Sequence, residues 1–95
     1  MDPRDTEHAM LERCALVARS ENAVAADARE ANVFRLAGMV VRSQFPAPSA
    51  RLRDAGERYF VTHPDEMLSA AQVLKNNWIV GLPRLRDMLS HRLTK

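Results

Sequence analysis

The chain contains few of the residues on which loops, disulfides and nucleotide sites depend. Of its 95 residues only three are glycine and one is cysteine, and no stretch alternates apolar and polar residues as a half-buried strand does. A single cysteine excludes an intramolecular disulfide, so a secreted disulfide-bonded scaffold is not expected. The glycines are isolated, so no glycine-rich loop is present to hold a phosphate. These absences indicate an all-α chain without nucleotide chemistry.

Long apolar runs are also absent, although 46% of the residues are apolar. No stretch approaches the roughly 20 apolar residues that span a bilayer. The beginning of the chain, "MDPRDTEHAML", has acidic residues where a signal peptide has a basic and then an apolar run. We therefore expect a cytoplasmic protein that does not bind a membrane.

The three histidines and Cys14 do not form a catalytic or metal-binding pattern. His8 and Glu12 share a helix face but lack the second histidine of a zinc site, and Cys14 falls on another face. We predict that Cys14 is a small buried hydrophobe, the usual role of a free cysteine. His63 and His91 lie near expected helix ends, where capping or surface roles are common. No enzyme activity, metal or cofactor is expected.

Helical signals predict an all-α single domain over residues 1–95, arranged as a small orthogonal bundle. "DPRD" predicts that a helix begins near Pro3, because proline is favourable in the first turn and acidic residues suit the helix dipole. No glycine or other proline follows before Gly38, and "NAVAADAREA" is rich in alanine. We expect helix over about 3–44, as one long helix or as two nearly collinear helices broken near residue 20.

Compact C-terminal helices are expected over about 49–93. Ser49 is placed to cap the first, whose oppositely charged residues one turn apart predict a solvated face. A second is expected to begin at Thr62 and to include "DEMLSAAQVLKNNWIV". Gly81 suits the position after that helix, where the backbone is often left-handed, and Pro83 suits the start of the last helix.

The best candidate for a contact surface is "VFRLAGMVVRSQF", where apolar residues surround much of one helix. On a helical wheel they cover roughly 180°, whereas one-sided packing requires only about 100°. The residues of "WIVGL" also spread around their helix. In so small a domain this surplus predicts that another chain covers part of it, with complete intramolecular packing as the alternative. The predicted partner-binding residues are Val33, Phe34, Leu36, Ala37, Val40, Val41, Phe45, Trp78 and Ile79.

These features predict a non-enzymatic protein-binding module that forms a homodimer. In size, helical pattern, lack of catalytic groups and the apolar segments "FRLAGMVV" and "WIVGL", the chain resembles the small bacterial antiactivators that sequester LuxR-type quorum-sensing regulators. The resemblance implies that the partner is a transcription factor. It also implies a mechanism, in which the protein covers the apolar dimerisation surface of that factor.

The segment "VLKNNWIVGLPRLRDML" leaves a DNA-binding regulator open as an alternative. The helix after Pro83 begins with basic residues, as recognition helices often do. The candidate DNA-binding residues are Arg84, Arg86 and Arg92. However, the small residue expected in the first helix of a helix-turn-helix lies ten positions before Gly81, and the net charge is only +2. A packed helical corner is therefore favoured, and a secretion chaperone or structural subunit is a third alternative.

Overall fold

The described part of the chain folds into helices and the connections between them. The computed structural model describes residues 3–76 and 81–94, and no β-strand occurs within them. The elements are α1 (Pro3–Ala18), α2 (Ala28–Val41), α3 (Pro46–Thr62), the 3-10 turn η1 (Pro64–Glu66), α4 (Ala70–Asn76) and α5 (Leu82–Leu93). The predicted all-α fold class is confirmed. The Cα radius of gyration is 12.1 Å, close to the value of about 12 Å for a compact domain of this length.

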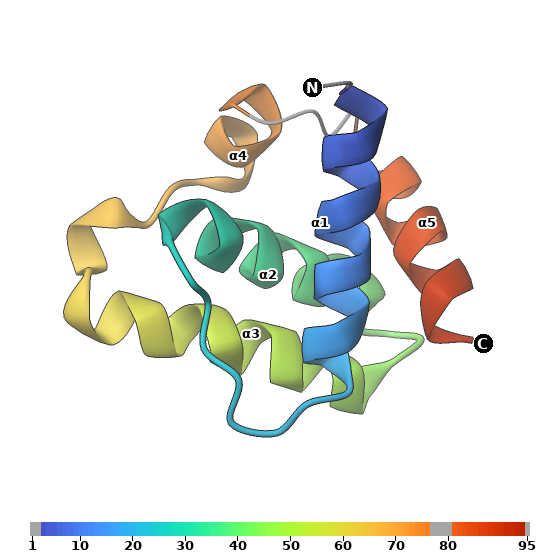
Figure 1. Cartoon of the computed structure of the whole chain (residues 1–95), viewed down its shortest axis with the longest axis horizontal. Coiled ribbons are helices and arrows are strands. Elements are labelled where there is room, and N and C mark those ends of the chain that lie inside the picture. The colour runs from blue at the N-terminus through green and yellow to red at the C-terminus, as the bar shows by residue number, and fades with distance from the viewer. Residues whose placement is uncertain (1–2, 77–80, 95) are drawn as a thin grey trace.

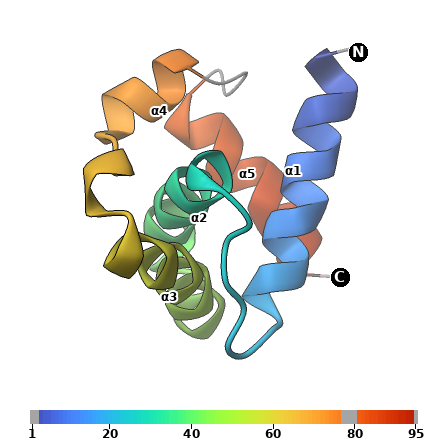
Figure 2. The same ribbon diagram turned by 60° about the vertical axis from the view of Figure 1, so that its left-hand side comes forward.

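The central helix of the molecule is α2. The helix α3 runs beside it in the opposite direction, and α1 crosses both (Figure 1, Figure 2). The helix α5 packs against α1 and α2, and α4 also contacts α2. Because neighbours lie on several sides of α2, eight of its 14 residues are buried. Its wide apolar arc is therefore covered largely by other helices of the same chain.

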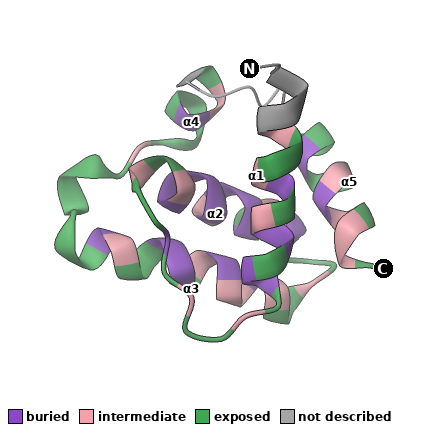
Figure 3. Cartoon of the chain, viewed as in Figure 1, coloured by how far each residue is buried: buried purple, intermediate pink, exposed green. Residues whose placement is uncertain are grey.

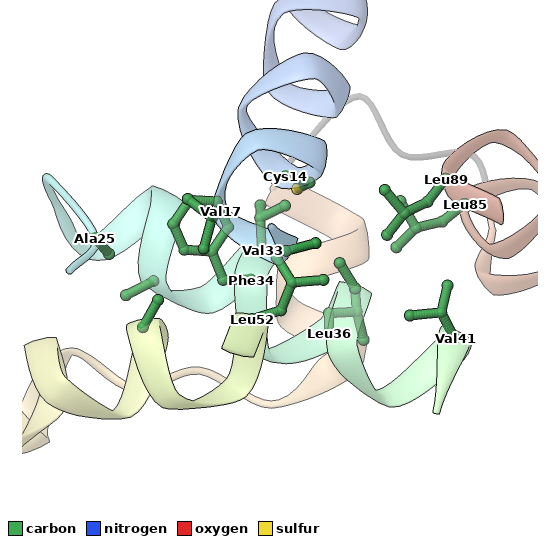
Figure 4. Close-up of a cluster of buried hydrophobic side chains, with 14 of the residues drawn as sticks. Cys14, Val17, Ala25, Val33, Phe34, Leu36, Val41, Leu52, Leu85 and Leu89 are labelled. Atoms are coloured by element: carbon green, nitrogen blue, oxygen red, sulfur yellow. The ribbon is translucent and has the colours of Figure 1, made fainter. Parts of the chain in front are cut away.

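The core contains side chains from α2 and from each of α1, α3, α4 and α5, and Figure 4 shows part of it. Phe34 of α2 is its largest fully buried residue. Burial of one such side chain stabilises the fold by about 1.5–3 kcal/mol. Cys14 of α1 is 0% exposed, which confirms the prediction that it is a buried hydrophobe. Other core residues are Leu11, Val17, Val33, Leu52, Leu85 and Leu89.

The prediction of helix over 3–44 is wrong in its middle part. The helix α1 ends at Ala18 and α2 begins at Ala28, so the interruption starts near residue 20 as expected but is longer. Figure 1 also shows that the two helices are not collinear. Within the connection Asn22 has a φ of 63°, a left-handed conformation that asparagine adopts more readily than most residues.

Local hydrogen bonds explain why the alanine-rich segment does not continue α1. The Asp27 side chain accepts a 2.9 Å hydrogen bond from the Glu30 N–H, and the Glu30 carboxylate accepts one of 3.0 Å from Ala26 N–H. These two hydrogen bonds cap the start of a new helix at α2. The N–H of Ala25 donates to the carbonyl of Ala55 at 3.3 Å, which holds the connection against α3. These contacts outweigh the small helix preference of alanine.

The third helix begins earlier than predicted. Pro46 occupies its first turn, so Ser49 lies inside α3 and is not its cap. Ser49 is fully buried, and its hydroxyl donates a 2.6 Å hydrogen bond to the carbonyl oxygen of Gly38. The serine therefore joins α3 to α2.

The fourth helix begins later than predicted, at Ala70 and not at Thr62. Ser69 and Gln72 form a capping box, in which Ser69 N–H donates to Gln72 Oε1 at 3.0 Å and Gln72 N–H donates to Ser69 Oγ at 3.2 Å. The prediction for Gly81 is also wrong, since its φ of 169° is extended and not left-handed. Gly81 directly precedes α5, which has a proline in its first turn as predicted.

Candidate binding site

The apolar arc that was predicted to bind a partner is mostly filled by the chain itself, as the buried surface of α2 in Figure 3 shows. Five of its residues are buried: Val33, Phe34, Leu36, Ala37 and Val41. Val40 and Phe45 are partly buried against the same core, and Trp78 and Ile79 lie outside the described residues. The expectation was that another chain covers part of the arc; most of the arc is covered by neighbours within the chain, because α2 is central, and only Val40 and Phe45 of its described residues are partly exposed.

The three arginines of the DNA-binding alternative are each paired with a carboxylate. The pairs are Arg84 with Glu7 at 3.2 Å, Arg86 with Asp87 at 3.2 Å, and Arg92 with Glu12 at 2.8 Å. Two of the pairs join α5 to α1. The hydrogen bond from Arg92 lowers the pKa of the Glu12 carboxyl. Neighbouring carboxylates weaken the attraction of these arginines for a phosphate backbone.

A hollow of about 550 Å³ opens between α2, α3 and the residues that lead into α4. Its volume lies within the range of about 300–1,000 Å³ that is usual for ligand-binding pockets. We call it the α2–α3 hollow. It is lined by Asn32, Arg35, Leu36, Met39, Arg53, Glu57, Met67, Leu68, Ser69, Ala70 and Val73.

Two glycines let α2 and α3 approach closely, and each accepts the stem of an arginine. A Cβ atom on Gly38 would lie 2.7 Å from Cγ of Arg53. A Cβ atom on Gly56 would lie 2.6 Å from the carbonyl oxygen of Ala31 and 2.8 Å from Cγ of Arg35. These distances are shorter than real contacts, so a side chain at either position would push the helices apart. The reciprocal packing places both arginines at the α2–α3 hollow.

The arginines of the hollow are not neutralised within the described part of the chain. Arg35 and Arg53 share the lining with one carboxylate, Glu57, and none of the three takes part in an ion pair there. The Arg35 guanidinium lies 5.8 Å from the ring centroid of Phe60. Nε of Arg53 is buried without a hydrogen-bond partner. A buried N–H without an acceptor costs about 1–3 kcal/mol, so Arg53 is held in this position by its packing and not by a hydrogen bond from Nε.

Residues 66–68 form one wall of the hollow, and Asn32 holds this wall in place. Its amide nitrogen donates to the carbonyl oxygens of Ala28 at 2.9 Å and Glu66 at 3.1 Å. Its Oδ1 accepts a 2.9 Å hydrogen bond from the N–H of Leu68. Asn32 is 4% exposed, so these bonds satisfy a buried polar group and fix the wall against α2.

Two methionines give the hollow an exposed apolar rim. Met39 of α2 is 49% exposed and Met67, which precedes α4, is 43% exposed. Both belong to the lining, together with the more deeply placed Leu36 and Leu68. Methionine is flexible and polarisable, so it adapts to the shape of an apolar ligand.

The groups around the hollow suit binding more than covalent chemistry. The Ser69 hydroxyl already accepts a hydrogen bond at the start of α4. Cys14 is buried elsewhere in the core, where burial raises the pKa of its thiol to about 12 and keeps it protonated. Within residues 3–76 and 81–94 no cluster of three or more histidine, cysteine or acidic residues is placed to hold a metal ion. The hollow offers guanidinium groups next to an apolar surface.

The methionines and arginines of the hollow are not among the site residues predicted from the sequence. Met39 and Met67 are far apart in the chain, and no periodic pattern connects them. The feature of the sequence that could have indicated this hollow is the position of two glycines. Gly38 and Gly56 lie in otherwise helical segments, where glycine costs about 1 kcal/mol relative to alanine. Such a position indicates close approach of a neighbouring helix.

Comparison of the chain with protein-family models, with curated proteins and with solved structures found no match. The resemblance to antiactivators therefore receives neither support nor contradiction from related proteins. None of the described helices is both long and apolar enough to cross a membrane.

Proposed function

We propose that the protein is a non-enzymatic regulator that binds another protein at the α2–α3 hollow. The observation that carries this proposal is the position of Met39 and Met67. They are two of the five large apolar residues that are exposed in the described part of the chain, and both line the same hollow. Exposed apolar side chains gathered around a concavity are typical of protein-binding surfaces.

The resemblance to antiactivators supports a more specific form of the proposal. In this form the partner is a LuxR-type transcription factor in the cytoplasm, and the protein covers its dimerisation surface. Expression of the protein together with such a regulator would lower transcription from the promoter of that regulator, and Met39→Lys would restore it. An unchanged promoter activity would contradict the proposal of a LuxR-type partner but not the proposal that a protein docks at the hollow.

Self-association is a separate proposal with less support. The sequence argument for a homodimer depended on the apolar arc of α2, and only Val40 and Phe45 of its described residues are partly exposed. Docking at the α2–α3 hollow does not require a second copy. Light scattering distinguishes a mass of 10.7 kDa for one chain from about twice that mass for a homodimer.

The DNA-binding alternative receives less support from the geometry. Arg84 and Arg92 join α5 to α1 through Glu7 and Glu12, so each has a structural role. Arg86 is paired with Asp87, a negative charge that phosphate repels. We therefore do not adopt it as a second function.

The docking proposal is tested with a photo-crosslinking amino acid placed at position 39 or at position 24 in cells of the source organism. Val24 is a matched control because it is 50% exposed and does not line the hollow. We expect one discrete covalent adduct from position 39 and none from position 24. Equal adducts from both positions, or none from either, would contradict the proposal.

A further inference from the structure

The charge of the α2–α3 hollow indicates which kind of protein segment would fit it. The lining includes two arginines, Arg35 and Arg53, and one acidic residue, Glu57. The lining is therefore net positive next to the apolar rim of Met39 and Met67. A purely apolar segment would cover these cations without replacing the water that solvates them, which is unfavourable. A segment that also carries a negative charge avoids this loss.

Arg53 is the better placed of the two arginines to meet that charge. Its Cγ packs in the notch at Gly38, and its Nε is buried without an acceptor. The packing restricts the first part of the side chain, so less rotamer freedom is lost when the guanidinium binds. A carboxylate accepts two parallel hydrogen bonds from such a group, and the resulting pair is stronger than a single neutral hydrogen bond.

The apolar rim determines where the rest of the segment would lie. Met39 and Met67 come from different segments of the chain, and both line the same hollow as Arg53. Their exposed thioethers extend the apolar surface beyond the buried Leu36. A side chain inserted between them would lie close to a carboxylate on the same segment.

We propose that the α2–α3 hollow binds a segment of a partner protein in which an aspartate or glutamate lies within one helical turn of a bulky apolar residue. The carboxylate pairs with Arg53, and the apolar side chain inserts between Met39 and Met67. This inference rests on the proposed function and adds the chemistry by which the partner is recognised.

The test uses the full-length protein to select binders from a displayed library of random peptides. We expect the selected peptides to share an acidic residue close to leucine, methionine, isoleucine or phenylalanine. Selected peptides without a common acidic residue, or failure to select any peptide, would overturn the inference.

Substitutions on both sides of the pair then measure the contact directly. Arg53→Gln should weaken the best peptide about tenfold, equivalent to about 1.4 kcal/mol. Replacement of the acidic residue of the peptide by its amide should give the same loss, and the two changes together should give little more. Arg42→Gln is the control, because Arg42 is exposed and outside the lining. Additive losses would overturn the carboxylate pairing, and the peptide-side change decides the matter even if Arg53→Gln unfolds the protein.

Two further measurements distinguish an error in the docking site from an error in the carboxylate recognition. If Met39→Lys and Met67→Lys abolish peptide binding but Arg53→Gln has no effect, the docking site stands and the carboxylate recognition is wrong. If none of the three substitutions affects the peptide, the docking site itself is wrong. Decanoate, which has a carboxylate on an apolar chain, should compete only weakly. Displacement of the peptide by micromolar decanoate would identify a free carboxylic acid as the occupant and overturn the proposal.

Discussion

Single glycine residues determine how α2 and α3 meet. At Gly56 the nearest obstacle to a side chain is the backbone carbonyl oxygen of Ala31, which cannot move without α2. At Gly38 the nearest atom is Cγ of Arg53, and the backbone carbonyl oxygen of Ser49 would lie 2.9 Å from the added Cβ. Both glycines therefore meet a backbone oxygen of the other helix, Gly56 more closely, and both place an arginine at the α2–α3 hollow.

We predict that Gly56→Ala lowers the free energy of unfolding by about 1–3 kcal/mol, because separation of the helices outweighs the gain of about 1 kcal/mol in helix preference. Urea denaturation measures this change. Gly81→Ala is the control, since its Cβ would meet nothing closer than Pro83 Cδ at 3.8 Å. A Gly56→Ala protein as stable as the wild type would show that the two helices do not pack as described.

Cys14 provides a second prediction at the residue scale. Burial raises the pKa of its thiol from 9.0 to about 12, so thiol reagents should react at pH 8 far more slowly in the folded protein than in urea. The same shift means that the stability contributed by the neutral thiol is fully present below pH 9 and is lost as the pH rises toward 12. Equal reaction rates in the two conditions would place Cys14 outside the core.

The elements around the hollow depend on caps and on one buried amide. The caps at Asp27 and Ser69 begin α2 and α4, and Asn32 attaches residues 66–68 to α2. Asn32 has the most consequence for the hollow, because two of its three hydrogen bonds, to Glu66 and Leu68, hold one wall of it.

We predict that Asn32→Ala destabilises the protein by about 1–3 kcal/mol, because buried groups lose their partners. It should also speed hydrogen exchange at the Leu68 amide, which then has no acceptor at Asn32. Nuclear magnetic resonance measures the exchange of this amide. Exchange as slow as in the wild type would mean that Asn32 does not hold the wall.

The sequence predicted the helical class and the start of α1, but not the boundaries around α2 and α4. At Asp27 and Ser69 a few hydrogen bonds outweigh helix preference, and propensity alone does not reveal such caps. The apolar arc was recognised correctly as too wide for one neighbour. The spacing of apolar residues in the sequence shows how wide the apolar surface of a helix is. It does not show whether that surface is covered by helices of the same chain or by another chain.

At the scale of the whole molecule, the net charge is only +2, and several arginines are paired locally with carboxylates. Arg84, Arg86 and Arg92 all contact carboxylates, so α5 presents less free positive charge than its sequence suggests. We predict weak DNA binding without sequence preference, which disappears as salt approaches physiological concentration. Fluorescence anisotropy with random and genomic fragments at two salt concentrations measures it. Nanomolar binding to one sequence at physiological salt would favour the DNA-binding alternative.

The α2–α3 hollow was less predictable than the fold because its parts meet only after the chain has folded. Met39, Arg53 and Met67 belong to three separate segments, and each alone has an ordinary structural explanation. Only the packing of α2 on α3 and the attachment of residues 66–68 bring them to one hollow. In the sequence, Gly38 and Gly56 indicate that another helix approaches closely, but they do not indicate which segments meet there.

The most direct test of the binding site compares Met39→Lys with Val24→Lys for affinity to the partner crosslinked at position 39. The two positions are 49% and 50% exposed, so both lysines should be tolerated by the fold, which circular dichroism checks. Isothermal titration calorimetry should show that Met39→Lys weakens binding about a hundredfold, because the lysine charge must be desolvated on docking next to two arginines. Val24→Lys should bind as the wild type does. Equal affinity of the two variants would contradict the assignment of the α2–α3 hollow as the site where the partner docks.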